Sequence, residues 1–322
     1  MGLTKHYFII NPKAGKFDIS EKLRERIDNL FKDIDEDYTI YITKGIGDAE
    51  DYCKNICQNE TGSLRFYAAG GDGTLNEVVN GIKGCDNASV GVLPYGTGND
   101  FIKNFEKVDF LNLDGQVVGK SEKIDLLRVK DKGCINICNI GFDAKVASQV
   151  NKFKKLPFMN GATAYTLALF YSLLNRMHEN FEITLDNNEV IKGNFLLCTF
   201  SNGVSYGGGY KAAPLAKIND GLFDVCLVKK VSRFKLVKLL GAYKNGEHLD
   251  NDEISKYIIY RKCKEVTVTS NNKFYISVDG EIFEDNKLKV SIEEEAINFL
   301  VPKVIEEEVI QEKMRIPSVS AN

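Results

Sequence analysis

A glycine-rich stretch with a carboxylate in its middle, Gly70–Thr74, carries the clearest chemical signal in this sequence. An apolar run, 64–69, precedes it and an apolar run with helical spacing, 78–82, follows it, so the order is strand, tight turn, helix. The glycines let a ligand approach bare backbone, and the N-terminus of the following helix suits phosphate. Asp72 would repel phosphate unless a metal ion or a hydroxyl group lies between them. The stretch therefore indicates nucleotide chemistry with a divalent cation.

Two further loops have the same character. Asn11–Gly15 ends an apolar strand, and Lys13 or Lys16 can add positive charge there, although Asn-Pro alone is mostly a turn signal. Pro94–Phe101 ends a later strand and opens a helix, with two glycines, a hydroxyl group and a capping-type residue. The glycine-rich stretch is neither a Walker A loop, which needs Gly-Lys-Ser/Thr, nor a dinucleotide fingerprint, which needs a third glycine. Together the three loops predict nucleotide binding that uses neither of these two motifs.

The first third of the chain must position these loops, and its apolar pattern alternates between strand and helix. The pattern predicts strands over 7–11, 38–43, 64–69 and 90–93, and helices over 20–34 and from Asp48. This order predicts a parallel sheet with helices on both faces, in which ligands bind beyond the carboxyl ends of the strands. Asn11, Thr43, Gly70 and Pro94 fall at those ends, so we expect four loops to converge on one rim.

After about residue 127 strand-like runs dominate, interrupted by two predicted helices over 162–177 and 232–246. Asp186–Asn188 and Asp285–Asn286 resemble hairpin turns. We therefore predict a nucleotide-binding α/β domain over 1–127, a mainly antiparallel β domain, a sandwich, over 128–303, and a tail over 304–322. The active cleft is expected between the two domains.

Composition excludes several classes of protein. The chain has 322 residues, of which 42 are basic and 45 acidic, and its net charge of −3 argues against a nucleic-acid partner. Eight cysteines without a CxxC pair favour buried reduced thiols over a zinc site, which fits a reducing cytosol. The N-terminus resembles no signal peptide, and no apolar stretch is long enough to span a bilayer. We expect a cytoplasmic protein whose contact with a membrane, if any, is local.

The motifs together resemble a known family. They are Asn11-Pro12-x-Ala14-Gly15, Gly70-Gly71-Asp72-Gly73-Thr74-x-Asn76-Glu77, Pro94-x-Gly96-Thr97-x-Asn99-Asp100-Phe101, Gly207–Pro214 with Asp220–Val225, and Val278-Asp279-Gly280-Glu281. In this order they resemble the soluble bacterial diacylglycerol kinase family, the lipid-kinase group that includes sphingosine and ceramide kinases. The resemblance covers nearly the whole chain. It implies an N-terminal domain similar to that of NAD kinase, or Rossmann-like, followed by a β-sandwich domain.

The resemblance also implies roles for matching positions. Asp72, Asp125 and Asp279 resemble an acidic network that organises a catalytic Mg²⁺ through water, and Glu281 resembles the general base. A second, structural Mg²⁺ site is implied at Lys217, Asp220 and Leu222. The implied ATP contacts are Asn11, Pro12, Lys13, Ala14, Gly15, Thr43, Gly70, Gly71, Asp72, Gly73, Thr74, Leu75, Asn76 and Thr97.

Each of these assignments has a structural alternative. Asp125 also fits an ordinary strand end, and Asp279-Gly280 and Asp220-Gly221 also fit plain turns. Gly207–Gly209 fits a flexible loop as well as a lid over a lipid cleft. For 162–177, core packing is favoured over contact with a lipid tail.

The resemblance thus implies an ATP- and Mg²⁺-dependent kinase that phosphorylates the hydroxyl group of diacylglycerol, or of a related lipid, to phosphatidic acid. One alternative is a soluble-metabolite kinase similar to NAD kinase, which shares the Gly-Gly-Asp-Gly-Thr loop; another is a catalytically silent lipid or nucleotide sensor. The expected partner is a lipid at the membrane surface, reached by peripheral contact, and the resemblance is compatible with a homodimer. The sequence leaves the choice of lipid open.

Overall fold

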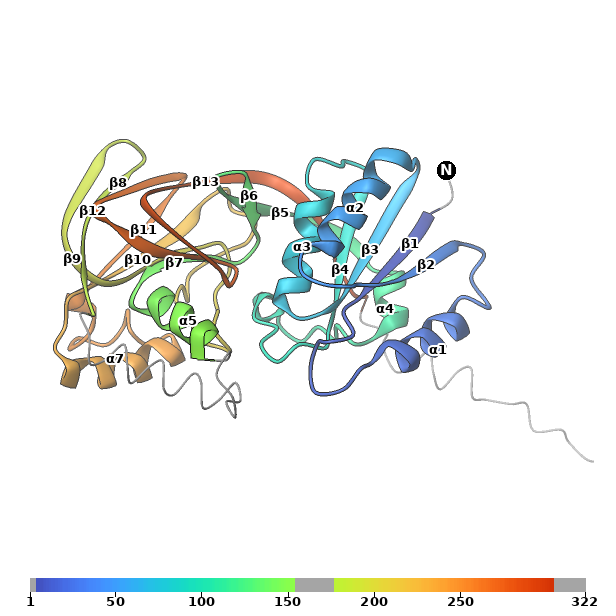
Figure 1. Cartoon of the computed structure of the whole chain (residues 1–322), viewed down its shortest axis with the longest axis horizontal. Coiled ribbons are helices and arrows are strands. Elements are labelled where there is room, and N and C mark those ends of the chain that lie inside the picture. The colour runs from blue at the N-terminus through green and yellow to red at the C-terminus, as the bar shows by residue number, and fades with distance from the viewer. Residues whose placement is uncertain (1–3, 154–176, 304–322) are drawn as a thin grey trace, which may run out of the picture.

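The computed structural model describes residues 4–153 and 177–303 (Figure 1). Its N-terminal part is an α/β unit whose parallel strands lie in the order β4-β3-β1-β2. The strands are β1 (Thr4–Ile10), β2 (Asp37–Ile42), β3 (Ser63–Gly70) and β4 (Ala88–Pro94). The helices are α1 (Ser20–Leu30), α2 (Asp48–Asn59), α3 (Asp72–Ile82), the short α4 (Leu113–Val117) and the 3₁₀ helix η1 (Phe101–Asn104).

Helices cover both faces of this parallel sheet because side chains alternate along its buried strands. In β1, Tyr7 and Ile9 face a cluster formed with α2 and α3, whereas Phe8 and Ile10 face a cluster formed with α1 and α4. Burial on both faces explains why the sequence of these strands reads as continuous apolar runs. The α/β prediction is confirmed.

The second part is a mainly antiparallel β-sandwich, so this prediction is also confirmed. Its core contains a cluster of buried aromatic side chains that includes Phe181, Phe195 and Phe274. Two helices, α5 (Phe142–Phe153) and α7 (Arg233–Asn245), share another apolar cluster with β7, β9 and β10, and η2 is a 3₁₀ helix (Ser255–Tyr257). The strands are β5 (Lys120–Val129), β6 (Lys132–Cys134), β7 (Ile137–Gly141), β8 (Glu179–Leu185), β9 (Glu189–Ser201), β10 (Phe223–Lys229), β11 (Ile258–Cys263), β12 (Glu265–Val278) and β13 (Glu281–Val301).

The long strand β13 joins the two parts, as the red ribbon between them shows (Figure 1). It pairs with β12 and β5 in the sandwich, and near its end Phe299 lies in parallel register with Val90 of β4. Its last residues pack in the N-terminal clusters, which include Ile297, Phe299 and Leu300. We predicted that all of 128–303 belongs to the second domain. In the structure the end of this stretch packs with the first domain.

The turns also differ in part from the sequence expectation. The predicted turn at Asp186–Asn188 is present, with φ angles of 46° and 57° at Asp186 and Asn187. The turn predicted at Asp285–Asn286 is wrong, because β13 continues through it and the chain reverses at Asp279 and Gly280 instead. The predicted helix over 162–177 lies outside the described residues except for its last residue, and the tail over 304–322 lies wholly outside them. None of the helices within residues 4–153 and 177–303 has the length and apolar character that a bilayer span requires.

Candidate active site

The carboxyl ends of the parallel strands enclose a polar cavity of about 690 Å³. As predicted, loops that follow β1, β2, β3 and β4 meet there. The predicted nucleotide contacts that line it are Asn11, Lys13, Ala14, Gly15, Thr43, Gly71, Asp72, Gly73, Thr74 and Thr97. Pro12, Gly70, Leu75 and Asn76 do not line it, and Leu75 is a core residue with 1% exposure.

Glycines allow the backbones of the loops after β3 and β4 to touch where the two loops cross. A Cβ atom on Gly70 would lie 2.3 Å from Thr74 Oγ1, and one on Gly96 would lie 2.3 Å from Gly71 Cα. Gly96 N donates to Gly70 O at 2.9 Å, and Asn11 Nδ2 of the first loop donates to Thr74 Oγ1 at 3.1 Å. The three loops therefore form one connected rim, which leaves backbone exposed to a ligand.

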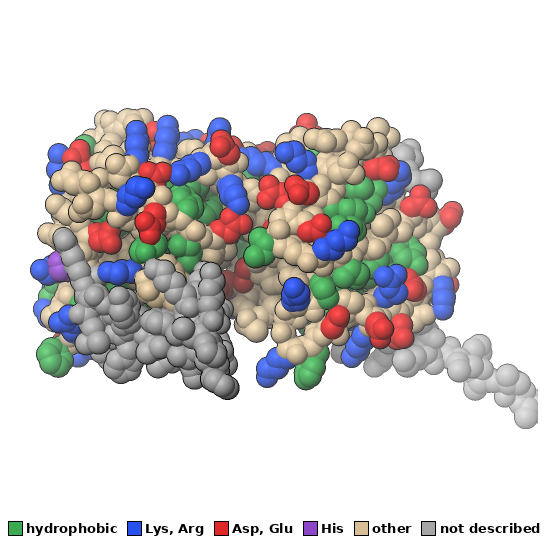
Figure 2. Space-filling model, viewed as in Figure 1, with side chains coloured by type: hydrophobic (Ala, Val, Ile, Leu, Met, Phe, Trp, Pro, Cys, Tyr) green, Lys and Arg blue, Asp and Glu red, His purple; other side chains and the backbone are tan. Residues whose placement is uncertain are grey.

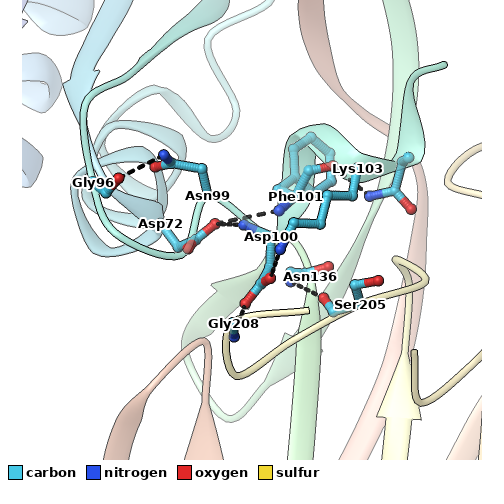
Figure 3. Close-up of polar contacts among 10 residues, drawn as sticks. Asp72, Gly96, Asn99, Asp100, Phe101, Lys103, Asn136, Ser205 and Gly208 are labelled. Atoms are coloured by element: carbon cyan, nitrogen blue, oxygen red, sulfur yellow. Dashed lines mark hydrogen bonds and ion pairs between the residues drawn. The ribbon is translucent and has the colours of Figure 1, made fainter. Parts of the chain in front are cut away.

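Asp72 is the first residue of α3, and it lines both this polar cavity and a second one. Its Oδ1 accepts from Asp100 N at 2.7 Å and from Phe101 N at 3.2 Å (Figure 3). Burial raises the pKa of this carboxyl, while the two backbone N–H groups oppose the rise. Gly71, without a side chain, precedes α3, so no side chain caps the first turn of the helix. Phosphate at that end would find backbone N–H groups.

The second cavity lies between the two parts of the molecule and has a volume of about 760 Å³. Four carboxylates line it: Asp72, Asp100, Asp143 and Asp279. The rest of the lining is largely apolar and comes mainly from β7, α5, β9 and α7, with Phe142, Val146, Leu197, Leu236, Leu239 and Ile282 among its residues. A cavity lined by both carboxylates and apolar side chains suits an amphipathic molecule.

Asp279 is held by the backbone of the segment before β7. Its carboxylate accepts from Ile135 N at 2.7 Å, Asn136 N at 3.2 Å and Ile137 N at 2.9 Å. Burial nevertheless raises the pKa of Asp279 to about 6. With its amide nitrogen turned toward Asp279 Oδ2, Asn76 of α3 donates to that oxygen at 3.2 Å. The two predicted acids Asp72 and Asp279 thus line one cavity, although they are far apart in the sequence.

The sequence analysis assigned no role to Asp100, which the structure brings into the same cavity. This residue is 4% exposed; it pairs with Lys103, and its Oδ2 accepts from Gly208 N at 2.7 Å (Figure 3). The bond to Gly208 ties the glycine loop of the second domain to the first domain. Asp100 falls within the Pro94–Phe101 motif, but its place in the sequence alone does not distinguish a helix cap from an active-site acid.

Asp143 is a second acid that sequence reasoning missed. It is the second residue of α5, and Tyr206 Oη donates to its Oδ2 at 2.6 Å. Burial raises the pKa of Asp143. Its only sequence signal is an Asp at the start of a helix, which usually indicates a favourable charge near a helix N-terminus.

Glu281 follows the turn that holds Asp279 and is the first residue of β13. Its side chain is half-exposed and forms an ion pair with Lys132. Gly280 lines the cavity between the domains and Glu281 does not. The structure therefore brings Glu281 to the border of the site.

Asp125 lies apart from both cavities. Its oxygens accept from Gly221 N and from Glu295 N, both at 2.8 Å, so it fastens the loop before β10 to β13. Asn202 Nδ2 donates to both Asp125 O and Ile135 O at 2.8 Å, which links this region to the segment that holds Asp279.

The loop with Lys217, Asp220 and Leu222 was predicted to hold a structural cation. Asp220 Oδ1 accepts from Leu222 N at 3.2 Å, and Asp220 Oδ2 lies 2.7 Å from Lys262 Nζ. A metal ion at Asp220 would compete with the ammonium group of Lys262. Across residues 4–153 and 177–303, no group of three or more His, Cys, Asp or Glu side chains could hold a metal ion. Mg²⁺ needs fewer protein ligands than that, because it retains waters and binds phosphate oxygens.

Family comparisons match two consecutive stretches of the chain. Residues 5–129 match the family described as the diacylglycerol kinase catalytic domain. Residues 136–301 match the family described as the YegS C-terminal NAD kinase beta sandwich-like domain.

Individual relatives agree with this match. A diacylglycerol kinase of Bacillus subtilis is 32% identical over 277 residues, which cover 85% of this chain and 88% of the relative. One from Staphylococcus aureus is 32% identical over 85% of this chain and 84% of its own length. A crystal structure of a diacylglycerol kinase from Bacillus anthracis shares the fold, with a TM-score of 0.67, 20% identity, and coverage of 94% of this chain and 98% of that one. Together with the connected glycine loops and the acids between the domains, these matches show that the chain belongs to the diacylglycerol kinase family.

Proposed function

We propose that this protein is an ATP- and Mg²⁺-dependent lipid kinase that phosphorylates the hydroxyl group of diacylglycerol, or of a related lipid, to phosphatidic acid. One observation carries the proposal: Asp72 lines both the polar cavity and the largely apolar cavity between the domains. Phosphoryl transfer requires donor and acceptor side by side, and two cavities of such different character meet at this carboxylate. The names of the relatives support diacylglycerol as the acceptor.

The polar cavity would hold the nucleotide. Backbone N–H groups at the start of α3 and Lys13 would bind the phosphates, and the bare backbone of Gly71 and Gly96 would let them approach. Exposed Ile46 also lines the cavity and offers an apolar contact for a base.

Asp72 and Asp279, with Asp100 beside them, would organise Mg²⁺ through bound water, and phosphate oxygens would be its direct ligands. Bound Mg²⁺ would neutralise charge that develops on the transferred group. Asp125 acts in this proposal as a positioning residue, because its oxygens already accept backbone N–H groups.

In the reaction, the lipid hydroxyl oxygen forms a bond to the γ-phosphorus, and the bond from that phosphorus to the β–γ bridging oxygen breaks. ADP leaves with that oxygen, and the hydroxyl proton passes to Glu281 as general base. The ion pair with Lys132 holds the Glu281 side chain at the border of the cavity. Catalysis rests on positioning and charge stabilisation.

An acceptor panel tests the proposal. The protein is incubated with Mg²⁺ and γ-labelled ATP in three separate reactions, which contain dioleoylglycerol, ceramide or NAD as the acceptor. We expect label in phosphatidic acid, and none in the Asp72→Ala or Glu281→Ala variant although each unfolds at nearly the wild-type temperature. Label in NAD alone would support the metabolite-kinase alternative. Nucleotide binding without transfer to any acceptor would support the sensor alternative.

A further inference from the structure

The first turn of α7 presents an aromatic side chain to solvent within a basic segment. Phe234 is 92% exposed. Residues 229–238 contain five basic residues and no acidic one. Figure 2 shows a protruding hydrophobic side chain close to Lys or Arg side chains at the end of the molecule where α7 lies. We define the α7 basic surface by exposed residues of this region: Lys229, Lys230, Phe234, Lys235, Lys238 and Lys256.

The surface includes a groove of about 260 Å³ whose lining contains Phe234 and three of these lysines. Lys235 Nζ bonds to the hydroxyl of Tyr257 and lies 4.7 Å from the centre of its ring, so the aromatic ring holds this ammonium group in place. The one acid in the groove lining, Glu253, lies 3.4 Å from Lys238. Cations therefore outnumber acids in the groove, and an anionic partner is complementary to it.

The buried side of α7 faces a different environment. Leu236, Leu239, Leu240 and Tyr243 of this helix line the large cavity between the domains. The helix thus carries the basic surface at its start and forms part of the apolar wall of the cavity along its length. A lipid that leaves a bilayer beside the first turn would reach apolar side chains of the same helix.

We propose that the α7 basic surface is the docking site for an anionic phospholipid membrane, with Phe234 inserted at the headgroup level and the lysines against anionic headgroups. The inference rests on the proposed function, which requires a lipid substrate. Because the whole chain has a net charge of −3, attraction to such a membrane must come from a local cluster. A two-fold interface between copies would place like charges near one another, which disfavours a second copy as the occupant.

Vesicle sedimentation without ATP tests the surface separately from catalysis. The variant Lys230→Glu/Phe234→Ser reverses one charge and removes the aromatic group. The matched control is Lys192→Glu/Val190→Ser on β9, where Val190 is 52% exposed and the Lys192 side chain is 67% exposed. With vesicles of phosphatidylcholine and phosphatidylglycerol, we expect the affinity of the α7 variant to be lower than that of wild type by a factor of about ten or more. The control variant should bind as wild type does, and pure phosphatidylcholine should bind wild type weakly.

A kinetic measurement completes the test. The α7 variant should lose activity toward long-chain diacylglycerol in the same vesicles and keep it toward a water-soluble short-chain diacylglycerol. Equal vesicle binding by wild type and α7 variant would overturn the docking site and leave the kinase proposal standing. Loss of a dimer in the α7 variant, with unchanged vesicle binding, would also overturn it in favour of a contact between copies. Vesicle binding that depends on α7, in a protein that phosphorylates no diacylglycerol, would support the surface and contradict the kinase.

Discussion

Asp72 illustrates how much depends on a single carboxylate. It sits at the N-terminus of α3, where the helix dipole favours negative charge, yet burial raises its pKa. Two backbone N–H groups of the loop after β4 hold one oxygen. The other oxygen, Oδ2, accepts no hydrogen bond from residues 4–153 and 177–303, so it is the atom we expect to face Mg²⁺ or its water.

Replacement of Asp72 by Asn removes the charge and keeps the size of the side chain. We expect kcat to fall by about 10²-fold or more, because charge stabilisation is lost where negative charge develops. Thermal unfolding should change little. The matched control is Asp285→Asn in β13, which removes an acid paired with Lys130 outside both cavities and should leave kcat unchanged. Wild-type kcat in Asp72→Asn would contradict the role.

The raised pKa of Asp279 predicts that activity and stability depend on pH in opposite directions. Its pKa is raised by burial to about 6, so below that pH the carboxyl is protonated and cannot act as an anion. We therefore expect kcat/KM to fall as the pH drops through about 6. Stability should run the other way, because the folded protein holds this proton more tightly than the unfolded chain does. Asp279 thus lowers the free energy of unfolding as the pH rises from 3.8 toward about 6.

Paired pH profiles of wild type and Asp279→Asn check this prediction. The rates give the first dependence, and urea unfolding gives the second. Both dependences should be missing from the variant. A rate profile without a change near pH 6, or one that Asp279→Asn preserves, would contradict the assignment.

At the scale of elements, the nucleotide rim depends on the crossing of two loops. The loops after β3 and β4 touch at Gly71 and Gly96, and a Cβ atom added to Gly96 would clash with Gly71 Cα at 2.3 Å. Packed backbone on both sides cannot relax as a flexible side chain would.

Gly96→Ala tests this crossing. We expect a loss of about 1–3 kcal/mol in the free energy of unfolding, because the methyl group forces the two loops apart. Nucleotide affinity, measured by calorimetry, should fall as well. The control Gly241→Ala lies within α7, where nothing is within 4 Å of the added Cβ, and it should stabilise the protein by about 0.5–1 kcal/mol. Equal stability of the two variants would show that the loops are not in tight contact.

At the scale of the whole molecule, β13 ties the two domains into one sheet. Phe299 near its end is fully buried, with ring centres 5.2 Å from both Phe101 and Phe105 and 6.2 Å from Phe110. Phe101 follows Asp100 directly, so the packing of the last strand supports a loop of the active site.

Phe299→Ala should therefore affect both stability and activity. We expect a loss of about 3–5 kcal/mol in the free energy of unfolding, from lost burial and the cavity left behind. The surviving folded fraction should also have a lower kcat, because the loop with Asp100 loses its support. Urea unfolding and single-turnover kinetics measure the two effects. The control Val118→Ala, at a site with 55% exposure, should change stability by less than about 0.5 kcal/mol.

The sequence by itself determined the elements and the loop chemistry of this protein. Glycine spacing, helix-start residues and apolar periodicity are local properties, so the parallel sheet, the rim of four loops and the mainly antiparallel second domain could be predicted from them. The chain reverses at Asp279 and Gly280 and not at the predicted Asp285–Asn286 turn, because which hairpin forms depends on strand register.

Only the tertiary structure decided which acids meet. Asp100 and Asp143 join Asp72 and Asp279 in one cavity, whereas Asp125 fastens a neighbouring loop. The pairing of the end of β13 with β4 of the first domain could not be predicted from the sequence either. These outcomes depend on packing between residues far apart in the chain, and a single sequence carries no record of such contacts, since the same Asp can cap a helix, close a turn or face a ligand.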